Sequence, residues 1–222
     1  MKIECFIFDF DGTLAELRLD FAAMKQQLNA LAGRYLTVAP PQPFLPVLEW
    51  LAWLEDKIRS SGGRSEGFRA QALARISEME MEAAKSGALF EFTRPLLKTL
   101  KAKGAKTAII TRNSEAAVRA VFPDLCEVCP AFFSRDHVIS PKPDPAHVVC
   151  ALEFLGADPR TAIMIGDHPL DIQTGKAAGI MTAGVCSGSA SRNELLAAGA
   201  DWIADDCRKL VEELSEQGRA SL

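Results

Sequence analysis

The sequence lacks an apolar run long enough to cross a membrane. Its two longest stretches without a charged residue are 35–48, which contains four prolines, and 177–191. Neither reaches the roughly 18 consecutive apolar residues that a transmembrane helix needs. The N-terminal apolar run is also too short for a secretory signal peptide, because Glu4 and Asp9 interrupt it. We therefore expect a cytoplasmic protein that has no membrane partner.

An excess of basic residues is missing as well. The 25 Lys and Arg residues are outnumbered by 29 Asp and Glu residues, which gives a formal net charge of −4 and a pI near 5.5. A protein of this charge has no electrostatic attraction for nucleic acid or for an anionic surface. We therefore expect no nucleic-acid partner.

The sequence shows no internal repeat, no low-complexity tract and no sign of a disulfide framework. The six cysteines accompany no predicted signal peptide, so they are expected to be reduced thiols and not a disulfide framework. Hydrophobic residues make up 48% of the chain and charged residues 24%, which are ordinary values for a globular protein. Composition thus excludes several protein classes without indicating a reaction.

Short apolar segments alternate with segments of helical periodicity over most of the chain. The predicted strands are 3–9, 106–111, 161–166, 181–185 and 202–204. The predicted helices between and after them are 93–103, 114–122, 144–155, 170–178, 192–198 and 207–217. This alternation predicts an α/β fold, with a Rossmann-like three-layer core around a mainly parallel sheet.

Residues 15–92 interrupt the alternation. They show no convincing strand, and loops rich in proline and glycine separate segments of helical periodicity. These helical segments are 21–33, 44–58 and 65–85. We therefore predict a helical insertion, 15–92, in an α/β catalytic core made of 1–14 and 93–222.

Acidic side chains follow two of the predicted strands. Asp9 and Asp11 end the first strand in the segment DFDGT, and Asp167 and Asp171 follow strand 161–166 in GDHPLD. Parallel sheets bind ligands beyond the carboxyl ends of their strands. Carboxylates gathered there raise each other's pKa, and a hard cation such as Mg²⁺ resolves this conflict. The sequence therefore predicts a magnesium site, which suits the handling of a phosphate group.

Donors for a phosphate group occur at the same edge of the predicted sheet. The segment Thr111-Arg112-Asn113 ends strand 106–111, and Lys142 precedes the helix that starts near Asp144. Threonine offers a hydroxyl donor, and lysine offers a compact positive charge. The candidates for phosphate binding are Thr111, Arg112 and Lys142.

The segments DFDGTL, TRN, the lysine before PDP, and GDHPLD occur in this order and resemble the motifs of the haloacid dehalogenase-like hydrolase superfamily. The resemblance covers the whole predicted core. The helical insertion is similar in position and type to the cap of the phosphoglycolate phosphatase-like branch. This resemblance implies a Mg²⁺-dependent phosphatase that acts on a small phosphorylated metabolite.

The resemblance also implies roles for individual residues. Asp9 would be the nucleophile that forms an aspartyl-phosphate, and Asp11 the general acid and later the general base. Thr111, Arg112 and Lys142 would hold the phosphoryl group.

The metal ligands follow from the same resemblance. Asp9 and Asp167 would bind Mg²⁺ directly, together with the main-chain carbonyl of Asp11. Asp171 would be a further ligand or a partner of the ligands.

Asp11 favours phosphate chemistry within the superfamily, because the dehalogenase and phosphonate-cleaving branches lack an aspartate at this position. A phosphomutase of the same fold, similar to beta-phosphoglucomutase, remains an alternative. A non-catalytic regulatory or binding protein is a third alternative.

The sequence leaves the substrate class open. Phosphoglycolate-like acids, sugar phosphates and nucleotides all remain open as substrates. The chain is expected to be a monomer or a homodimer.

Overall fold

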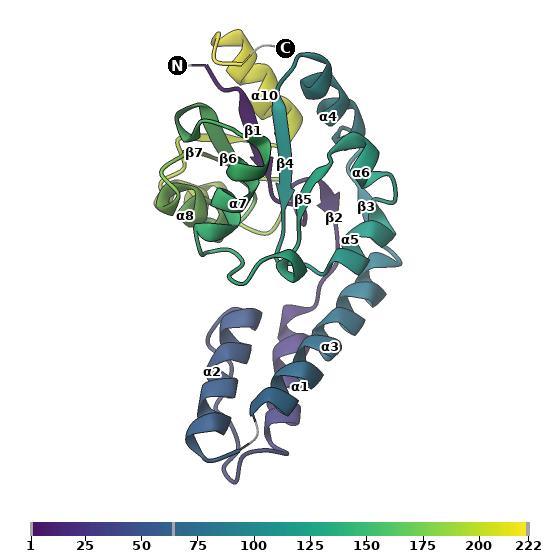
Figure 1. Cartoon of the computed structure of the whole chain (residues 1–222), viewed down its shortest axis with the longest axis vertical. Helices are drawn as coiled ribbons and strands as arrows, with labels where there is room; N and C mark the ends of the chain where they lie inside the picture. The colour runs from purple at the N-terminus through teal and green to yellow at the C-terminus, as the bar shows by residue number, and fades with distance from the viewer. Residues whose placement is uncertain (1, 64, 221–222) are drawn as a thin grey trace. The chain divides into compact units, whose positions relative to one another are not determined.

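The computed structural model describes residues 2–63 and 65–220. Contacts between residues divide the chain into two compact units (Figure 1). The larger unit contains the residues up to Leu17 and those from Ala84 onward, and the smaller is Arg18–Ala83. The larger unit contains both sheets, and the smaller is built of helices.

A six-stranded parallel sheet forms the centre of the larger unit. Its strand order is β5-β4-β1-β6-β7-β8, and each neighbouring pair is parallel. The strands are β1 (Cys5–Phe8), β4 (Lys106–Ile110), β5 (Ala131–Phe133), β6 (Ala162–Gly166), β7 (Met181–Val185) and β8 (Trp202–Ala204). The predicted α/β, Rossmann-like fold is thus confirmed.

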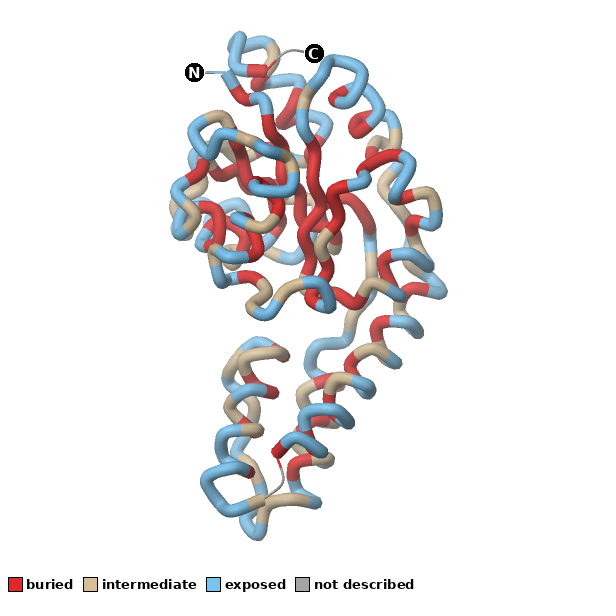
Figure 2. Tube along the Cα trace, in the orientation of Figure 1, coloured by how far each residue is buried: buried red, intermediate tan, exposed pale blue. Residues whose placement is uncertain are grey.

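Two layers of helices cover the sheet, one on each face. Phe6 and Phe8 of β1 belong to one hydrophobic core, and Cys5 and Ile7 to the other, because successive side chains of a strand point to opposite faces. The first core is completed by α4 (Thr93–Ala102), α5 (Glu115–Val121), α6 (Leu125–Val128) and α10 (Cys207–Glu216). The other face is covered by α7 (Ala146–Leu155) and α8 (Pro169–Ala177). Figure 2 shows the central strands buried along their length.

The remaining elements of the larger unit are short. Helix α9 (Arg192–Ala197) contacts β7, β8 and α8. The 3₁₀ helices are η1 (Arg135–His137) and η2 (Pro159–Thr161).

Two short strands correct the expectation that 15–92 contains no strand. β2 (Ala15–Glu16) and β3 (Ala88–Leu89) pair antiparallel, with Ala15 opposite Leu89. Each strand has two residues, which is too few for an alternating pattern to be recognised in a sequence. The pairing makes the chain leave and re-enter the larger unit at neighbouring positions.

The smaller unit contains α1 (Phe21–Ala32), α2 (Val47–Ser60) and most of α3 (Ser65–Ala84). Asp20 caps α1, since its carboxylate accepts a hydrogen bond from the Ala23 N–H at 2.8 Å. Helix α2 begins at Val47 and not at residue 44 as predicted, because Pro46 disfavours helical backbone at the residue before it.

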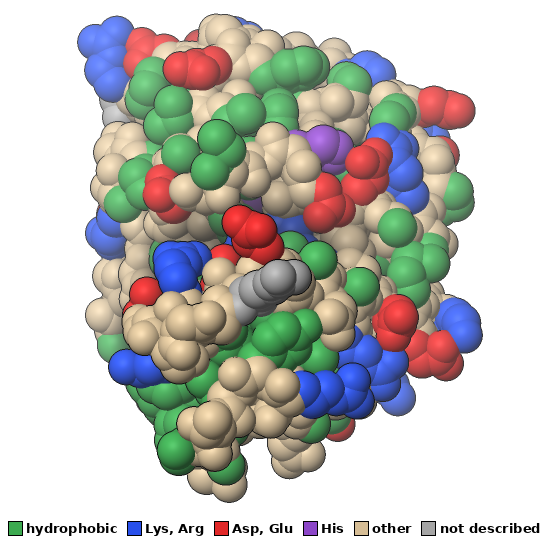
Figure 3. Space-filling view, turned by 60° about the horizontal axis from the view of Figure 1, so that its bottom comes forward, with side chains coloured by type: hydrophobic (Ala, Val, Ile, Leu, Met, Phe, Trp, Pro, Cys, Tyr) green, Lys and Arg blue, Asp and Glu red, His purple; other side chains and the backbone are tan. Residues whose placement is uncertain are grey.

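No helix within the described part of the chain is both long enough and apolar enough to span a membrane. On the face drawn in Figure 3, basic and acidic side chains lie interspersed. This mixture agrees with the small net charge of −4.

Candidate active site

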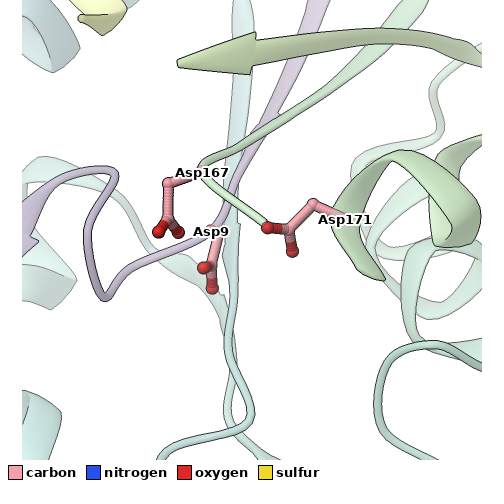
Figure 4. Close-up of side chains that lie close together, drawn as sticks. All are labelled: Asp9, Asp167 and Asp171. Atoms are coloured by element: carbon pink, nitrogen blue, oxygen red, sulfur yellow. The ribbon is translucent and has the colours of Figure 1, made fainter. Parts of the chain in front are cut away.

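Three buried carboxylates meet at the carboxyl edge of the parallel sheet. Asp9 follows β1, Asp167 follows β6, and Asp171 lies in the first turn of α8. Figure 4 shows the three side chains gathered at this edge. One oxygen of each lies within 4.8 Å of the others. The structure therefore brings together three of the carboxylates that the sequence singled out.

Lys142 joins two of these carboxylates. Its Nζ lies 2.6 Å from Asp9 Oδ1 and 2.6 Å from Asp171 Oδ1, and the lysine is only 2% exposed. Burial lowers the pKa of Lys142, but the carboxylates of Asp171 and Asp9 outweigh this effect and raise the pKa above its ordinary value. The side chain is therefore a charged ammonium group.

The acidic side chains of this group outnumber the basic one. The group consists of Asp9, Asp167, Asp171 and Lys142. Burial raises the pKa of Asp9 well above its usual range; Lys142 opposes this effect, while Asp171 and Asp167 add to it. The pKa of Asp167 is also raised, first by burial and then by Asp171. Crowded oxygen donors with excess negative charge are the ligands that Mg²⁺ prefers, so the residues present fit such an ion.

The loop after β7 orients the Asp167 carboxylate, which sequence analysis did not anticipate. Ser189 donates two hydrogen bonds to Asp167 Oδ2, from its backbone N–H at 2.8 Å and from its hydroxyl at 3.2 Å. Gly188 and Gly12 pass so close that a Cβ atom at either position would overlap this carboxylate. The only signal in the sequence is a serine–glycine run shortly after a predicted strand.

Asp11 lies beside the segment that follows β4. The Asn113 Nδ2 lies 3.2 Å from both Asp11 oxygens, and the Thr111 hydroxyl donates to Asp11 Oδ2 at 3.4 Å. Asn113 Oδ1 in turn accepts a hydrogen bond from the Ser114 N–H at 2.8 Å. Asn113 therefore fixes the direction of the Asp11 carboxylate.

The model of the family described as "haloacid dehalogenase-like hydrolase" matches residues 3–179, which is most of the chain. The chain belongs to the haloacid dehalogenase-like hydrolases. The resemblance inferred from the motifs is confirmed, and the protein is an enzyme of the hydrolase class.

Several proteins similar to this haloacid dehalogenase-like hydrolase are known. Phosphoglycolate phosphatase of Pseudomonas putida is 28% identical over 218 residues, covering 92% of this chain and 77% of its own. N-acetylmuramic acid 6-phosphate phosphatase of Pseudomonas aeruginosa is 28% identical over 232 residues, covering 96% of each chain. The crystal structure of a hydrolase from Pseudomonas syringae covers 97% of this chain and 99% of its own, with a TM-score of 0.70 at 21% identity, and supports the fold.

His168 and Asp171 cap helix α8 of this haloacid dehalogenase-like hydrolase together. The His168 Nδ1 accepts a hydrogen bond from the Leu170 N–H at 3.1 Å, and Asp171 Oδ2 accepts one from the His168 N–H at 3.1 Å. Each side chain thereby accepts a hydrogen bond from a backbone N–H group at the start of α8. His168 contributes to the site by fixing the direction of Asp171.

Arg112 is the predicted site residue with the least support from the geometry. Its backbone carbonyl accepts a hydrogen bond from Arg135 Nη1 at 2.9 Å. A role of the Arg112 side chain in phosphate binding stays a prediction.

Proposed function

We propose that this hydrolase is a Mg²⁺-dependent phosphatase that forms an aspartyl-phosphate on Asp9. The observation that carries the proposal is the Lys142 ammonium held between the buried carboxylates of Asp9 and Asp171, each at 2.6 Å. A buried positive charge next to a carboxylate nucleophile is suited to attract a phosphate dianion to it. The two relatives described above are both named as phosphatases.

The reaction proceeds in two steps. A carboxylate oxygen of Asp9 attacks phosphorus, the bond to the leaving oxygen breaks, and Asp11 gives its proton to that oxygen. Asp11 then takes a proton from a water molecule, whose oxygen attacks the phosphorus of the aspartyl-phosphate and releases Asp9. Asn113 holds the Asp11 carboxylate in one direction during both proton transfers.

The phosphoryl group is held by Lys142 and Thr111, with Arg112 as a further candidate. Asp9, Asp167, Asp171 and the main-chain carbonyl of Asp11 would hold Mg²⁺. When bound, Mg²⁺ supplies positive charge that offsets the carboxylates and the substrate phosphate.

The proposed substrate is a small phosphorylated acid. Phosphoglycolate and N-acetylmuramic acid 6-phosphate, which the relatives are named for, both carry a carboxylate besides the phosphate. The proposed selector of the substrate is the helical unit, Arg18–Ala83, which makes up most of the predicted insertion 15–92. We propose that the enzyme works in the cytoplasm as a monomer or a homodimer.

Phosphate release from a panel of phosphorylated acids, sugar phosphates and nucleotides tests the proposal. The measurement is made with and without Mg²⁺, and the Asp9→Asn variant serves as the blank. Asp158→Asn is the matched control, because Asp158 forms an ion pair with Arg160 on the surface. We expect Mg²⁺-dependent release that is lost in Asp9→Asn and kept in Asp158→Asn.

Other outcomes contradict the proposal. Release that persists in Asp9→Asn excludes Asp9 as the nucleophile. Isomerisation of a sugar phosphate in the presence of a bisphosphate activator, with little net release, indicates a phosphomutase. The absence of turnover and of Mg²⁺ binding indicates a non-catalytic protein.

A further inference from the structure

His147 is a buried histidine that the proposed reaction does not use. It lies in the first turn of α7 and is 0% exposed. Its Nδ1 lies 3.2 Å from the backbone nitrogen of Lys142, and its Nε2 lies 2.9 Å from the carbonyl oxygen of Phe133. The imidazole ring therefore bridges the loop that carries Lys142 and the end of β5.

The two backbone partners determine the protonation state of this ring. The Lys142 N–H can only donate, so Nδ1 must accept and carries no proton. The Phe133 carbonyl can only accept, so Nε2 must donate. His147 is thus the neutral tautomer with its proton on Nε2.

The charged groups near the ring agree with this assignment. Burial lowers the pKa of His147 to about 4, and the charges of Lys142, His137 and Arg112 act in the same direction. A proton on Nδ1 would also break the hydrogen bond to the Lys142 N–H.

The carbonyl of Phe133 has a second partner. It accepts a hydrogen bond from the backbone N–H of Thr111 at 3.0 Å, in addition to the one from His147. A continuous path of hydrogen bonds therefore runs from the Thr111 backbone through the Phe133 carbonyl and the His147 ring to the Lys142 backbone. Its two ends are the two residues proposed to hold the phosphoryl group.

We propose that His147 is a positioning residue, which holds the Lys142 backbone in place relative to Thr111 so that the ammonium group and the threonine bind one phosphoryl group. This inference rests on the proposed phosphatase function. His147 does not touch the substrate and acts through Lys142. A histidine that only stabilised the fold would affect activity equally with and without the Lys142 side chain.

Two substitutions separate the two hydrogen bonds of the ring. In His147→Asn, the amide oxygen can take the place of Nδ1 and accept from Lys142. In His147→Gln, the amide nitrogen can take the place of Nε2 and donate to Phe133, while the acceptor for Lys142 is lost. His137→Gln is the matched control, because His137 is partly exposed and pairs with Glu115.

A double-mutant cycle with Lys142→Ala tests whether His147 acts through the lysine. We expect His147→Gln to lower kcat/KM about tenfold, the equivalent of one hydrogen bond, and His147→Asn to restore most of the loss. In the Lys142→Ala background we expect His147→Gln to have almost no effect. An equal effect in both backgrounds, equal loss in the Asn and Gln variants, or an equal loss in His137→Gln would overturn the inference.

Two further measurements keep this inference separate from the proposed function. The ¹⁵N NMR shifts of His147 report its tautomer without any turnover, and a proton on Nδ1 at neutral pH would contradict the inference. If the wild-type protein releases no phosphate, the proposed function fails, and the same cycle is measured on the affinity for inorganic phosphate. There, coupling between His147 and Lys142 supports the inference, and the absence of phosphate binding or of coupling overturns it.

Discussion

Lys142 holds its ammonium group between two buried carboxylates, so removing it affects both neighbours. In Lys142→Ala, Asp9 and Asp171 lose their shared partner. Under the proposed function, the phosphoryl group also loses a preorganised positive charge. Loss of one such stabilising group costs about 3 kcal/mol or more in the transition state. We therefore expect kcat to fall at least about 100-fold.

Steady-state kinetics on the best substrate of the panel measure this effect. Lys209→Ala is the matched control, because Lys209 pairs with Asp205 on the surface. Near-normal kinetics in Lys142→Ala would place the lysine outside the reaction.

Ser189 offers a test of the proposed metal site. Its two hydrogen bonds hold Asp167 Oδ2 in one direction, and Ser189→Ala removes the one from the hydroxyl. We expect the affinity for Mg²⁺ to fall about fivefold, the equivalent of about 1 kcal/mol. Calorimetry of Mg²⁺ binding, without substrate, measures it.

Ser191→Ala is the control for Ser189, because it lies in the same loop and caps α9 through Glu194. We expect this variant to bind Mg²⁺ as the wild-type protein does. An equal loss of affinity in both variants would show that the loop as a whole, and not the Ser189 hydroxyl, is responsible.

His147 makes stability depend on pH in a defined direction. Its pKa is lowered from 6.5 to about 4 in the folded protein, so between these values the unfolded chain binds more protons. The free energy of unfolding therefore falls as the pH drops from about 6.5 toward 4, by up to about 3 kcal/mol from this residue. Urea unfolding at pH 7.5 and pH 4.5 should show a smaller loss in His147→Gln. The same loss in both proteins would contradict this expectation.

A hydrogen bond between two side chains joins α1 and α2 of the smaller unit. Asn29 of α1 accepts a hydrogen bond from the buried Trp50 Nε1 of α2 at 2.8 Å, and it donates one to the Pro41 carbonyl at 2.9 Å. Asn29→Leu leaves the indole N–H without this acceptor. We expect the free energy of unfolding to fall by about 1–3 kcal/mol, measured by urea unfolding followed by far-UV circular dichroism.

Trp50→Phe provides the matched background for this test. Without an indole N–H to be left unpaired, Asn29→Leu should cost less in that background. An equal cost in both backgrounds would assign the effect to the hydrogen bond with Pro41.

Most elements of four or more residues, and the three-residue strand β8, could be predicted from the sequence, whereas α6 and the short strands β2, β3 and β5 could not. The apolar runs of β1, β4, β6 and β7 stand out because both of their faces are buried. β5 has three residues, which carry no recognisable period.

The residues of the candidate site were likewise predictable only in part. Asp9, Asp167 and Asp171 could be predicted to meet, because the carboxyl ends of parallel strands share an edge. Ser189 and His147 could not, because their contacts depend on how loops approach the site and not on a pattern near them in the chain.

At the scale of the whole molecule, each hydrophobic core belongs to one unit. Both cores beside the parallel sheet consist of residues of the larger unit, and the core around Trp50 consists of residues of the smaller one. Strands β2 and β3 pair with each other, so the point where the chain leaves the larger unit lies next to the point where it re-enters. We therefore expect the larger unit to keep both of its cores when 18–83 are replaced by a short linker.

We expect this shortened protein to fold. Its far-UV circular dichroism should retain helical and strand signals, and it should unfold in one cooperative thermal transition, as small single domains do. The full chain, treated in the same way, is the control. A gradual transition, or exposed apolar surface that binds dye, would show that the larger unit depends on residues 18–83.

The position of β1 in the sheet has a consequence for how the protein is made. β1 pairs with β4 on one side and β6 on the other, through Lys106 and Ala162 opposite Cys5, so both neighbours follow long after it in the chain. Because translation proceeds from the N-terminus, the segment CFIF leaves the ribosome long before either neighbour exists. An apolar strand with two unpaired edges invites aggregation. Until β6 has been synthesised, the nascent chain therefore carries this apolar strand with at least one edge unpaired.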